Sequence, residues 1–253
     1  MLGKIKATVR KIVNKMGFDV HRIFDPVRFF RSDHYLRLNA RRLEHLASLR
    51  IPVAGLSVLE VGAGIGDHSH YFIDRGCSVT ITEARAENLS FLEKSYPDCP
   101  VRSLDMDSPS DIDGSPFDMI YCYGLLYHLS KPKQALSFLS QNTTGMLFLE
   151  TRVSFGEEKE INLTTERQSH PGEAYSGIGC KPTRSWLFET LQQLFKYVYL
   201  PTTQPRHEEF PLDWTDAEKH KAWCQRAIFI ASHEPLENDN LTTSLADHQI
   251  RHE

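Results

Sequence analysis

Short apolar runs rich in β-branched residues alternate along the middle of the chain with stretches whose apolar positions recur at helical spacing. The runs that predict strands are residues 57–61, 78–82, 101–104, 117–122 and 146–150. The stretches that predict helices lie near residues 67–75, 86–95 and 132–141. Because strands and helices that alternate in this way form parallel sheets, the pattern predicts an α/β fold with helices on both faces of a mostly parallel sheet.

The same kind of pattern extends to both sides of this alternation. Before it, Ser32 and Asp33 open a helical stretch that runs to about residue 48. After it, a predicted helix near residues 184–195 is followed by two strand candidates, at 197–200 and 226–231. These elements predict helices ahead of the sheet and further strands on it.

The pattern also divides the chain into regions. We expect N-terminal helices over residues 1–50 and a sheet domain over residues 51–233. Two polar, irregular stretches, 154–182 and 201–223, interrupt the second half of that domain. Residues 234–253 are polar and have no apolar period, which predicts a disordered tail.

Charge is unevenly distributed between the first helix and the rest of the chain. The formal net charge is −4, from 29 lysines and arginines against 33 acids among 253 residues. Residues 1–18 carry five cations and no acid, which leaves −9 on the remainder. Apolar residues at helical spacing make this segment a basic amphipathic helix, which either docks on its own domain or makes weak contact with an anionic membrane surface. The acidic remainder disfavours a nucleic-acid partner.

Cysteine usage and the N-terminus bear on location. The five cysteines are widely spaced and form no CxxC pair, which favours a reducing compartment and argues against a structural zinc site. The lysines near the N-terminus interrupt any signal-peptide core, and no apolar run is long enough to span a membrane. We therefore expect a cytoplasmic protein, with peripheral membrane contact through residues 1–18 as an alternative.

A glycine-rich turn carries the strongest chemical signal. The predicted strand that contains Glu60 runs into Gly62, Gly64 and Gly66, and a helix follows directly. Glycines at such a turn let the backbone bend sharply and come close to a ligand. The spacing is G-x-G-x-G rather than the G-x-G-x-x-G of dinucleotide binders, and an acid beside it suits a cationic ligand better than a phosphate. Glu83 ends the next strand, where a carboxylate can bind both hydroxyls of a ribose.

These residues resemble those of the class I S-adenosylmethionine-dependent methyltransferases. Asp105 after the third strand and the segment from Phe117 to Leu129 add to the likeness, which is firm over about residues 50–150. The resemblance implies a Rossmann-like, seven-stranded sheet whose last two strands form an antiparallel hairpin. It also implies an enzyme, a methyltransferase, with S-adenosyl-L-methionine as cofactor.

The resemblance also implies roles for individual residues at the cofactor. Gly62, Gly64 and Gly66 would pack against the methionine part, with Glu60 nearby, and Glu83 would bind the ribose hydroxyls. Asp105 would face the adenine amino group and Tyr123 would lie near the cofactor. Asp107 is a second acid in the same loop, and the register after the third strand favours Asp105.

Methyl transfer to oxygen or nitrogen can require a base that takes a proton from the acceptor. The candidates are His128, His170 and His207, of which His128 is best placed, just after the fourth strand. For each of the three, a structural or surface histidine is the alternative. His68 and His70 form a weak metal signal, so we expect no metal site.

The two polar insertions are expected to build the acceptor side, because such segments vary on a fixed scaffold. Within and near them, the expected acceptor-binding residues are Tyr127, His170, Tyr175 and Arg184. Phe210 and Trp214 either form aromatic walls of the pocket or anchor a long loop.

The acceptor predicted by this reasoning is a small molecule, a sugar or a glycan. The segment from Gly124 to Leu129 is similar to one in the tRNA wobble-uridine carboxymethyl transferases, which use a carboxylated cofactor, but the chain lacks the basic character of those proteins. Two alternatives stay open: a regulatory protein that only binds the cofactor, and a membrane-recruited enzyme with a lipid-linked acceptor. The oligomeric state is not predicted.

Overall fold

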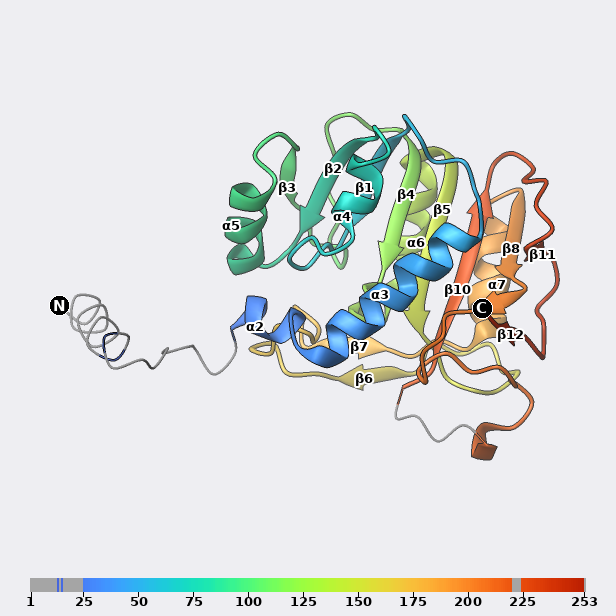
Figure 1. Cartoon of the computed structure of the whole chain (residues 1–253). Helices are drawn as coiled ribbons and strands as arrows, with labels where there is room; N and C mark the ends of the chain where they lie inside the picture. Colours follow the sequence, from blue (N-terminus) through green and yellow to red (C-terminus); the bar gives the residue numbers. More distant parts are fainter. Residues whose placement is uncertain (1–12, 14, 16–24, 220–223, 253) are drawn as a thin grey trace.

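The computed structural model describes residues 13, 15, 25–219 and 224–252. Its centre is an eight-stranded sheet in the order β11-β8-β10-β5-β4-β1-β2-β3 (Figure 1). The strands of this sheet are β1 (Ser57–Val61), β2 (Ser78–Glu83), β3 (Val101–Ser103), β4 (Phe117–Tyr123), β5 (Thr143–Arg152), β8 (Tyr197–Pro201), β10 (Arg226–Ser232) and β11 (Leu241–Thr242). All seven predicted strands are present, and β11 adds a short edge strand.

The sheet is parallel from β3 to β5 and antiparallel beyond it. β1 pairs in parallel with β2 and β4, and β4 pairs in parallel with β5. β10 runs antiparallel to both β5 and β8. The predicted seven-stranded fold with a terminal antiparallel hairpin is thus confirmed, and the carboxyl ends of β1, β2 and β4 meet at one edge.

Helices cover both faces of the sheet. They are α2 (Pro26–Phe30), α3 (Asp33–Ser48), α4 (Ser69–Ile73), α5 (Ala86–Ser95), α6 (Pro132–Gln141), α7 (Arg184–Leu194) and the short 3-10 helices η1 (Leu126–His128) and η2 (Ala217–Lys219). None of the helices in the described part of the chain has the length and apolar character needed to cross a membrane. The basic segment predicted over residues 1–18 lies outside the described residues, apart from Val13 and Lys15.

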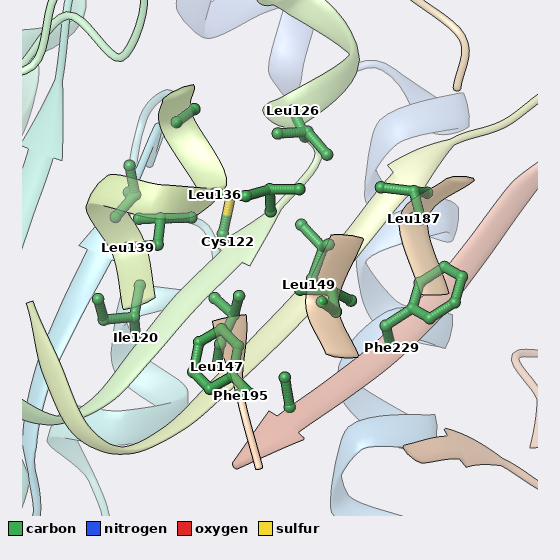
Figure 2. Packing of buried hydrophobic residues seen from close by; sticks show 14 of the residues in the cluster. Ile120, Cys122, Leu126, Leu136, Leu139, Leu147, Leu149, Leu187, Phe195 and Phe229 are labelled. Carbon is green, nitrogen blue, oxygen red and sulfur yellow. The ribbon is translucent and has the colours of Figure 1, made fainter. Parts of the chain in front are cut away.

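Two apolar clusters hold these layers together, one on each face. Figure 2 shows the first, in which Ile120 and Cys122 of β4 and Leu147 and Leu149 of β5 pack against α6 and α7. The second contains Met119 and Tyr121 of β4 together with apolar residues of α3, α4 and α5. Because side chains alternate along a strand, the apolar run in β4 supplies both clusters.

The 154–182 insertion forms a small hairpin. Its strands β6 (Leu163–Thr165) and β7 (Ile178–Cys180) pair antiparallel, and β7 contacts η1. In Figure 1 this hairpin lies beyond the carboxyl end of β4, on the side where α2 and the start of α3 also lie. The insertion therefore adds a layer over the edge of the sheet at which ligands bind in open α/β folds.

The disordered tail predicted for residues 234–253 is not what the structure shows. β12 (Ile250–Arg251) pairs with β9 (Thr203–Gln204), and Asn238 Nδ2 donates a hydrogen bond of 2.7 Å to the Leu49 carbonyl. Polar side chains here take part in specific hydrogen bonds, so the lack of an apolar period did not mean a lack of order.

Gln249 is the main polar anchor of this C-terminal segment. Its side-chain oxygen accepts hydrogen bonds from Gln204 Nε2 (2.8 Å) and Trp214 Nε1 (2.9 Å), and its amide donates to the Pro201 carbonyl (2.6 Å). Trp214 and Phe210 are both buried, so they anchor the 201–219 loop rather than form walls of an open pocket.

We expect Gln249→Ala to lower the free energy of unfolding by about 2 kcal/mol, because it leaves buried partners without hydrogen bonds. Chemical denaturation monitored by circular dichroism measures the change. Ile250→Ala is the control, because that neighbouring side chain is 69% exposed and its loss should have little effect. Equal effects of the two variants would contradict the anchoring role of Gln249.

Candidate cofactor and acceptor pocket

A pocket opens at the carboxyl ends of β1, β2 and β4. Its floor is the turn that follows β1, and its sides come from the loops after β2, β3 and β4. α2, α3 and residues 171–175 of the insertion cover it. Of the residues predicted for the cofactor or the acceptor, the pocket is lined by Glu60, Gly62, Gly64, Glu83, Asp105, Tyr123, Tyr127, His128 and Tyr175.

The glycines of the turn after β1 all adopt positive φ. Gly62 has φ 70°, Gly64 φ 61° and Gly66 φ 84°, a region in which residues with a Cβ are strained. Gly62 and Gly64 expose their backbone to the pocket, but Gly66 does not line it. A Cβ at Gly66 would collide with the Tyr96 ring, so this glycine allows close packing behind the turn.

Glu60 is buried at the end of β1, and its carboxyl group has a strongly raised pKa. Its Oε2 accepts a hydrogen bond of 2.5 Å from Ser69 Oγ, and 2% of the residue is exposed. Burial raises the pKa of Glu60 to about 7, against the lowering effect of the Ser69 hydroxyl. A cationic ligand beside it would favour the ionised form.

Glu83 ends β2 with its carboxylate held by the backbone. Oε2 accepts from the Gly64 amide at 2.9 Å, and Oε1 accepts from the Ala84 and Arg85 amides at 2.8 and 3.0 Å. The bond to Gly64 ties the end of β2 to the glycine turn. Burial raises the pKa of Glu83, while these backbone amides oppose the rise. The residue faces the pocket with both oxygens fixed in place.

The two acids after β3 differ in what they bind. Asp107 Oδ1 accepts from the amides of Ser130 and Lys131 at 2.7 and 3.1 Å, and so holds the start of α6. Among the described residues, the hydrogen bond found at Asp105 is a local one, from the Asp107 amide to Oδ1 at 3.0 Å. Both acids line the pocket, and Asp107 is the one that ties this loop to the start of α6 in the described part of the chain.

Buried polar atoms without partners test whether the pocket fits S-adenosylmethionine. Among the described residues, the Tyr123 hydroxyl and His68 Nε2 are buried, belong to residues that line the pocket, and make no hydrogen bond. Such atoms cost free energy unless a ligand or water meets them. With acids for a cation, an open glycine turn and aromatic walls, the residues present fit this cofactor.

His128 forms a hydrogen-bonded pair with Glu166 that the sequence did not reveal. His128 Nδ1 and Glu166 Oε2 lie 2.7 Å apart, and each side chain is 14% exposed. Glu166 follows β6 in the insertion, and its distance in sequence from His128 hides the pairing. The only sequence signal for this pair was that Glu166 is a carboxylate directly after a strand of the insertion.

A buried cluster of arginines and glutamates lies on the other side of Tyr127. We define it as Arg42, Arg226, Glu150 and Glu209. Arg226 contacts Glu150 Oε1 at 2.9 Å and Glu209 Oε2 at 2.5 Å, and Arg42 contacts Glu150 Oε2 at 2.5 Å. All four are 4% exposed or less. Glu150 in β5 and Arg226 in β10 are charged residues beside apolar runs in their strands, which marks them as unusual in the sequence but does not show that they pair.

Tyr127 connects that cluster to the pocket. Its hydroxyl accepts a hydrogen bond of 3.4 Å from Arg226 Nη2, and the guanidinium carbons of Arg152 and Arg226 lie 4.7 and 5.1 Å from its ring centre. Arg42 also lines the pocket, and its Nε is buried with no hydrogen-bond partner among the described residues. Arginine side chains therefore line or back the pocket wall at Tyr127, although Arg42 and Arg226 are also paired with buried carboxylates.

Two predicted acceptor-binding residues lie elsewhere. Arg184, at the start of α7, is buried against the Trp214 ring at 4.1 Å and donates to the Ala246 carbonyl at 2.7 Å. These contacts account for an arginine at a helix N-terminus without a ligand. The His170 ring packs 4.7 Å from the Phe29 ring and accepts a hydrogen bond from the Gly172 amide. The neighbouring residues Pro171 and Gly172 line the pocket, but His170 does not.

The other histidines considered from the sequence lie outside the acceptor side of the pocket, with His207 and His68 buried and His70 exposed. His207 is 2% exposed, and its Nδ1 accepts from the Glu209 amide at 3.3 Å, outside the pocket. His68 Nδ1 lies 3.0 Å from the Tyr121 hydroxyl, and the His70 ring packs 5.1 Å from that of Tyr96. No group of three or more potential metal ligands occurs in the part of the chain that the structure describes.

Comparisons with known proteins agree with this geometry. Residues 58–142 match the family model described as "Methyltransferase domain". The tRNA U34 carboxymethyltransferase of Methylococcus capsulatus is 30% identical over 182 residues, which are 68% of this chain and 53% of the relative. The protein of the same name from Photobacterium profundum is 27% identical over 159 residues, 58% of this chain and 46% of the relative. The chain thus spans about half the length of these curated relatives.

A solved structure extends the likeness across the fold. The N-terminal domain of EvdMO1 with SAH bound superposes with a TM-score of 0.60 at 21% identity, over 79% of this chain and 84% of that one. At this identity the match shows the fold alone.

The curated relatives overturn one prediction. They are named for tRNA, which contradicts the inference that the acidic charge disfavours a nucleic-acid partner. A charge summed over the chain does not report the charge of one surface. Arg28, Arg31 and Arg37 are exposed on and beside α2 and α3, the elements that cover the pocket.

Proposed function

Because this chain carries a class I S-adenosylmethionine-dependent methyltransferase domain, we propose that it transfers a one-carbon group to an oxygen or nitrogen of a tRNA nucleoside. We propose further that the transferred group carries a carboxylate, as in the relatives named carboxymethyltransferase. The observation that carries this proposal is the buried Nε of Arg42, a residue that lines the pocket, because this atom has no hydrogen-bond partner among the described residues.

The arginines around Tyr127 support an anionic group. Arg152 and Arg226 lie over the Tyr127 ring and Arg42 lines the same pocket, while Glu150 and Glu209 pair with Arg226 in the cluster. Burial disfavours the charge on Arg226, but Glu150 and Tyr127 outweigh that effect and hold its pKa above the ordinary value. In a site with little water, a carboxylate that accepts from the Arg42 and Tyr127 side chains is held by charge-assisted hydrogen bonds.

The residues of the chain have mainly positioning tasks in this reaction. When bound, the sulfonium supplies an electrophilic carbon. Glu83 and Asp105 orient the nucleoside part, Glu60 lies where a positive charge is stabilised, and α2 with residues 171–175 excludes water. A nucleoside of tRNA would have to leave its base stack to enter a pocket covered in this way.

A second candidate is methyl transfer to a small molecule or a sugar. The cover formed by α2, α3 and residues 171–175 favours it, because a pocket closed from two sides suits a small acceptor without rearrangement. A cytoplasmic location and contact of residues 1–18 with membranes stay predictions.

Two measurements test the proposal. Calorimetry compares the binding of S-adenosylmethionine with that of its carboxylated form, and mass spectrometry identifies the products. We expect tighter binding of carboxylated S-adenosylmethionine than of the plain form, and a carboxymethyl group on a nucleoside of unmodified tRNA. Tyr127→Phe keeps the ring but removes the hydroxyl, so it should weaken binding of the carboxylated form about fivefold or more and leave the plain form unchanged. Equal binding of both forms, or a labelled small molecule in place of tRNA, would overturn the proposal in favour of the second candidate.

A further inference from the structure

The pair formed by His128 and Glu166 is placed for proton transfer at the acceptor side of the pocket. His128 ends η1, directly after β4, and lines the pocket beside Tyr127. Glu166 comes from the insertion and reaches Nδ1 of the imidazole at 2.7 Å. The second ring nitrogen, Nε2, is therefore the one left for a ligand.

Glu166 is held in place independently of the histidine. Its Oε2 also accepts from the Ala174 amide at 2.5 Å, and its own amide donates to the Gly177 carbonyl at 2.9 Å. The hairpin that carries it is attached to η1, since Cys180 Sγ donates to the Leu126 carbonyl at 3.4 Å. The carboxylate thus has a fixed position before it meets the imidazole.

We propose that Glu166 is a positioning residue that holds His128 in the tautomer with Nδ1 protonated, so that Nε2 can accept the proton of the methyl or carboxymethyl acceptor. This inference rests on the proposed transfer function and identifies the base for it. The same relation between carboxylate and imidazole sets the tautomer in hydrolytic triads.

The proton and electron pairs balance within this step. The acceptor oxygen or nitrogen forms a bond to the transferred carbon as the carbon–sulfur bond breaks, and the electron pair of that bond goes to sulfur. Nε2 of His128 takes the proton that the acceptor loses. The resulting imidazolium lies against the Glu166 carboxylate until the proton passes to water.

The charges around the pair suit a base at neutral pH. Burial lowers the pKa of His128, the Glu166 carboxylate raises it, and the charges of Arg152 and Arg226 lower it further. Burial raises the pKa of Glu166, but the His128 hydrogen bond and the Ala174 amide outweigh this and leave it below its ordinary value. The pair therefore consists of a carboxylate and a neutral imidazole at pH 7.

A measurement without acceptor or cofactor tests the pair itself. Long-range nitrogen NMR of histidine-labelled protein, assigned with His128→Asn, should show Nδ1 protonated and Nε2 bare at pH 7. Glu166→Gln should lower the pKa of His128 by about one unit or more, because it removes an opposite charge at hydrogen-bond distance. Glu189→Gln is the control, since Glu189 binds Lys159 of the same insertion at 2.5 Å on the surface.

Transfer rates then test the role in catalysis. In the tRNA assay, His128→Asn should lower kcat about 10²-fold or more without a change in cofactor affinity. Glu166→Gln should move the acid limb of the pH–rate profile to lower pH by the same amount as the NMR pKa, and Glu189→Gln should not move it. A His128 protonated at Nε2, or a profile that Glu166→Gln leaves in place, would overturn the inference. If the NMR result were as expected but no acceptor received the group, the proposed function would be refuted, and with it the role of His128 as a base. The hydrogen-bonded pair of His128 and Glu166 would still stand.

Discussion

Replacing Arg226 by alanine is expected to lower the free energy of unfolding by about 3 to 5 kcal/mol, the largest effect of any single substitution described for this protein. Arg226 is 1% exposed and opens β10, at the centre of the antiparallel part of the sheet. It contacts Glu150 at 2.9 Å and Glu209 at 2.5 Å. Without it, Glu209 keeps only His34 at 3.2 Å as an ion-pair partner among the described residues, and Glu150 keeps only Arg42.

The penalty comes from the charges left behind rather than from the strength of the lost pair. Two carboxylates removed from water need cationic or hydrogen-bond partners, and each loses one. Urea denaturation of the purified variant measures the change. Arg37→Ala is the matched control, because Arg37 also pairs with a glutamate, Glu208, but both side chains are about half exposed. We expect that control to change stability by less than about 1 kcal/mol. A similar small change for Arg226→Ala would mean that the cluster contributes little to the fold.

This cluster illustrates what the sequence could not predict. The strands that carry Glu150 and Arg226 follow from their apolar runs, and the register pairs Arg226 with Arg152 rather than with Glu150. The ion pair forms because side chains from β5, β10, α3 and the 204–210 loop converge on one buried point. Convergence of this kind depends on tertiary packing, which periodicity along the chain does not contain.

The sheet itself was predictable because its local signals agree with one another. In β4, every residue from Met119 to Tyr123 is buried, and alternate side chains enter the two apolar clusters. A short run of this composition between turn signals has few other solutions than a central strand. The C-terminal segment lacks such a run and is held by Gln249 and Asn238 instead, which explains why the sequence suggested disorder there.

The glycine turn was predictable in place but not in every role. Gly62 and Gly64, which are separated by one residue, both line the pocket. Gly66 lies on the far side of the turn and packs against the Tyr96 ring. The sequence shows only that three positions require glycine. Whether the missing side chain makes room for a ligand or for another part of the protein depends on which direction each Cα faces.

Glu83→Ala is expected to weaken S-adenosylmethionine binding by about 1 to 3 kcal/mol, or about 5-fold to 150-fold in Kd. Two losses contribute to this change. The ribose loses the proposed charged hydrogen bonds, and the Gly64 amide loses the acceptor that ties the glycine turn to β2 at 2.9 Å. Calorimetric titration of the folded variant measures the affinity, and needs no knowledge of the acceptor.

Glu83→Gln separates these two contributions. Its amide oxygen, in the place of Oε1, can still accept from the Ala84 and Arg85 amides, while its NH₂ group cannot accept from the Gly64 amide or from a hydroxyl. We expect an affinity between those of the wild type and Glu83→Ala, with a thermal stability closer to the wild type. Asp107→Ala serves as the comparison, because that acid holds the start of α6 and should lower stability more than cofactor affinity. If Glu83→Ala bound the cofactor as tightly as the wild type, another residue would have to hold the ribose. Asp105 would be the first to examine, because it lines the same pocket.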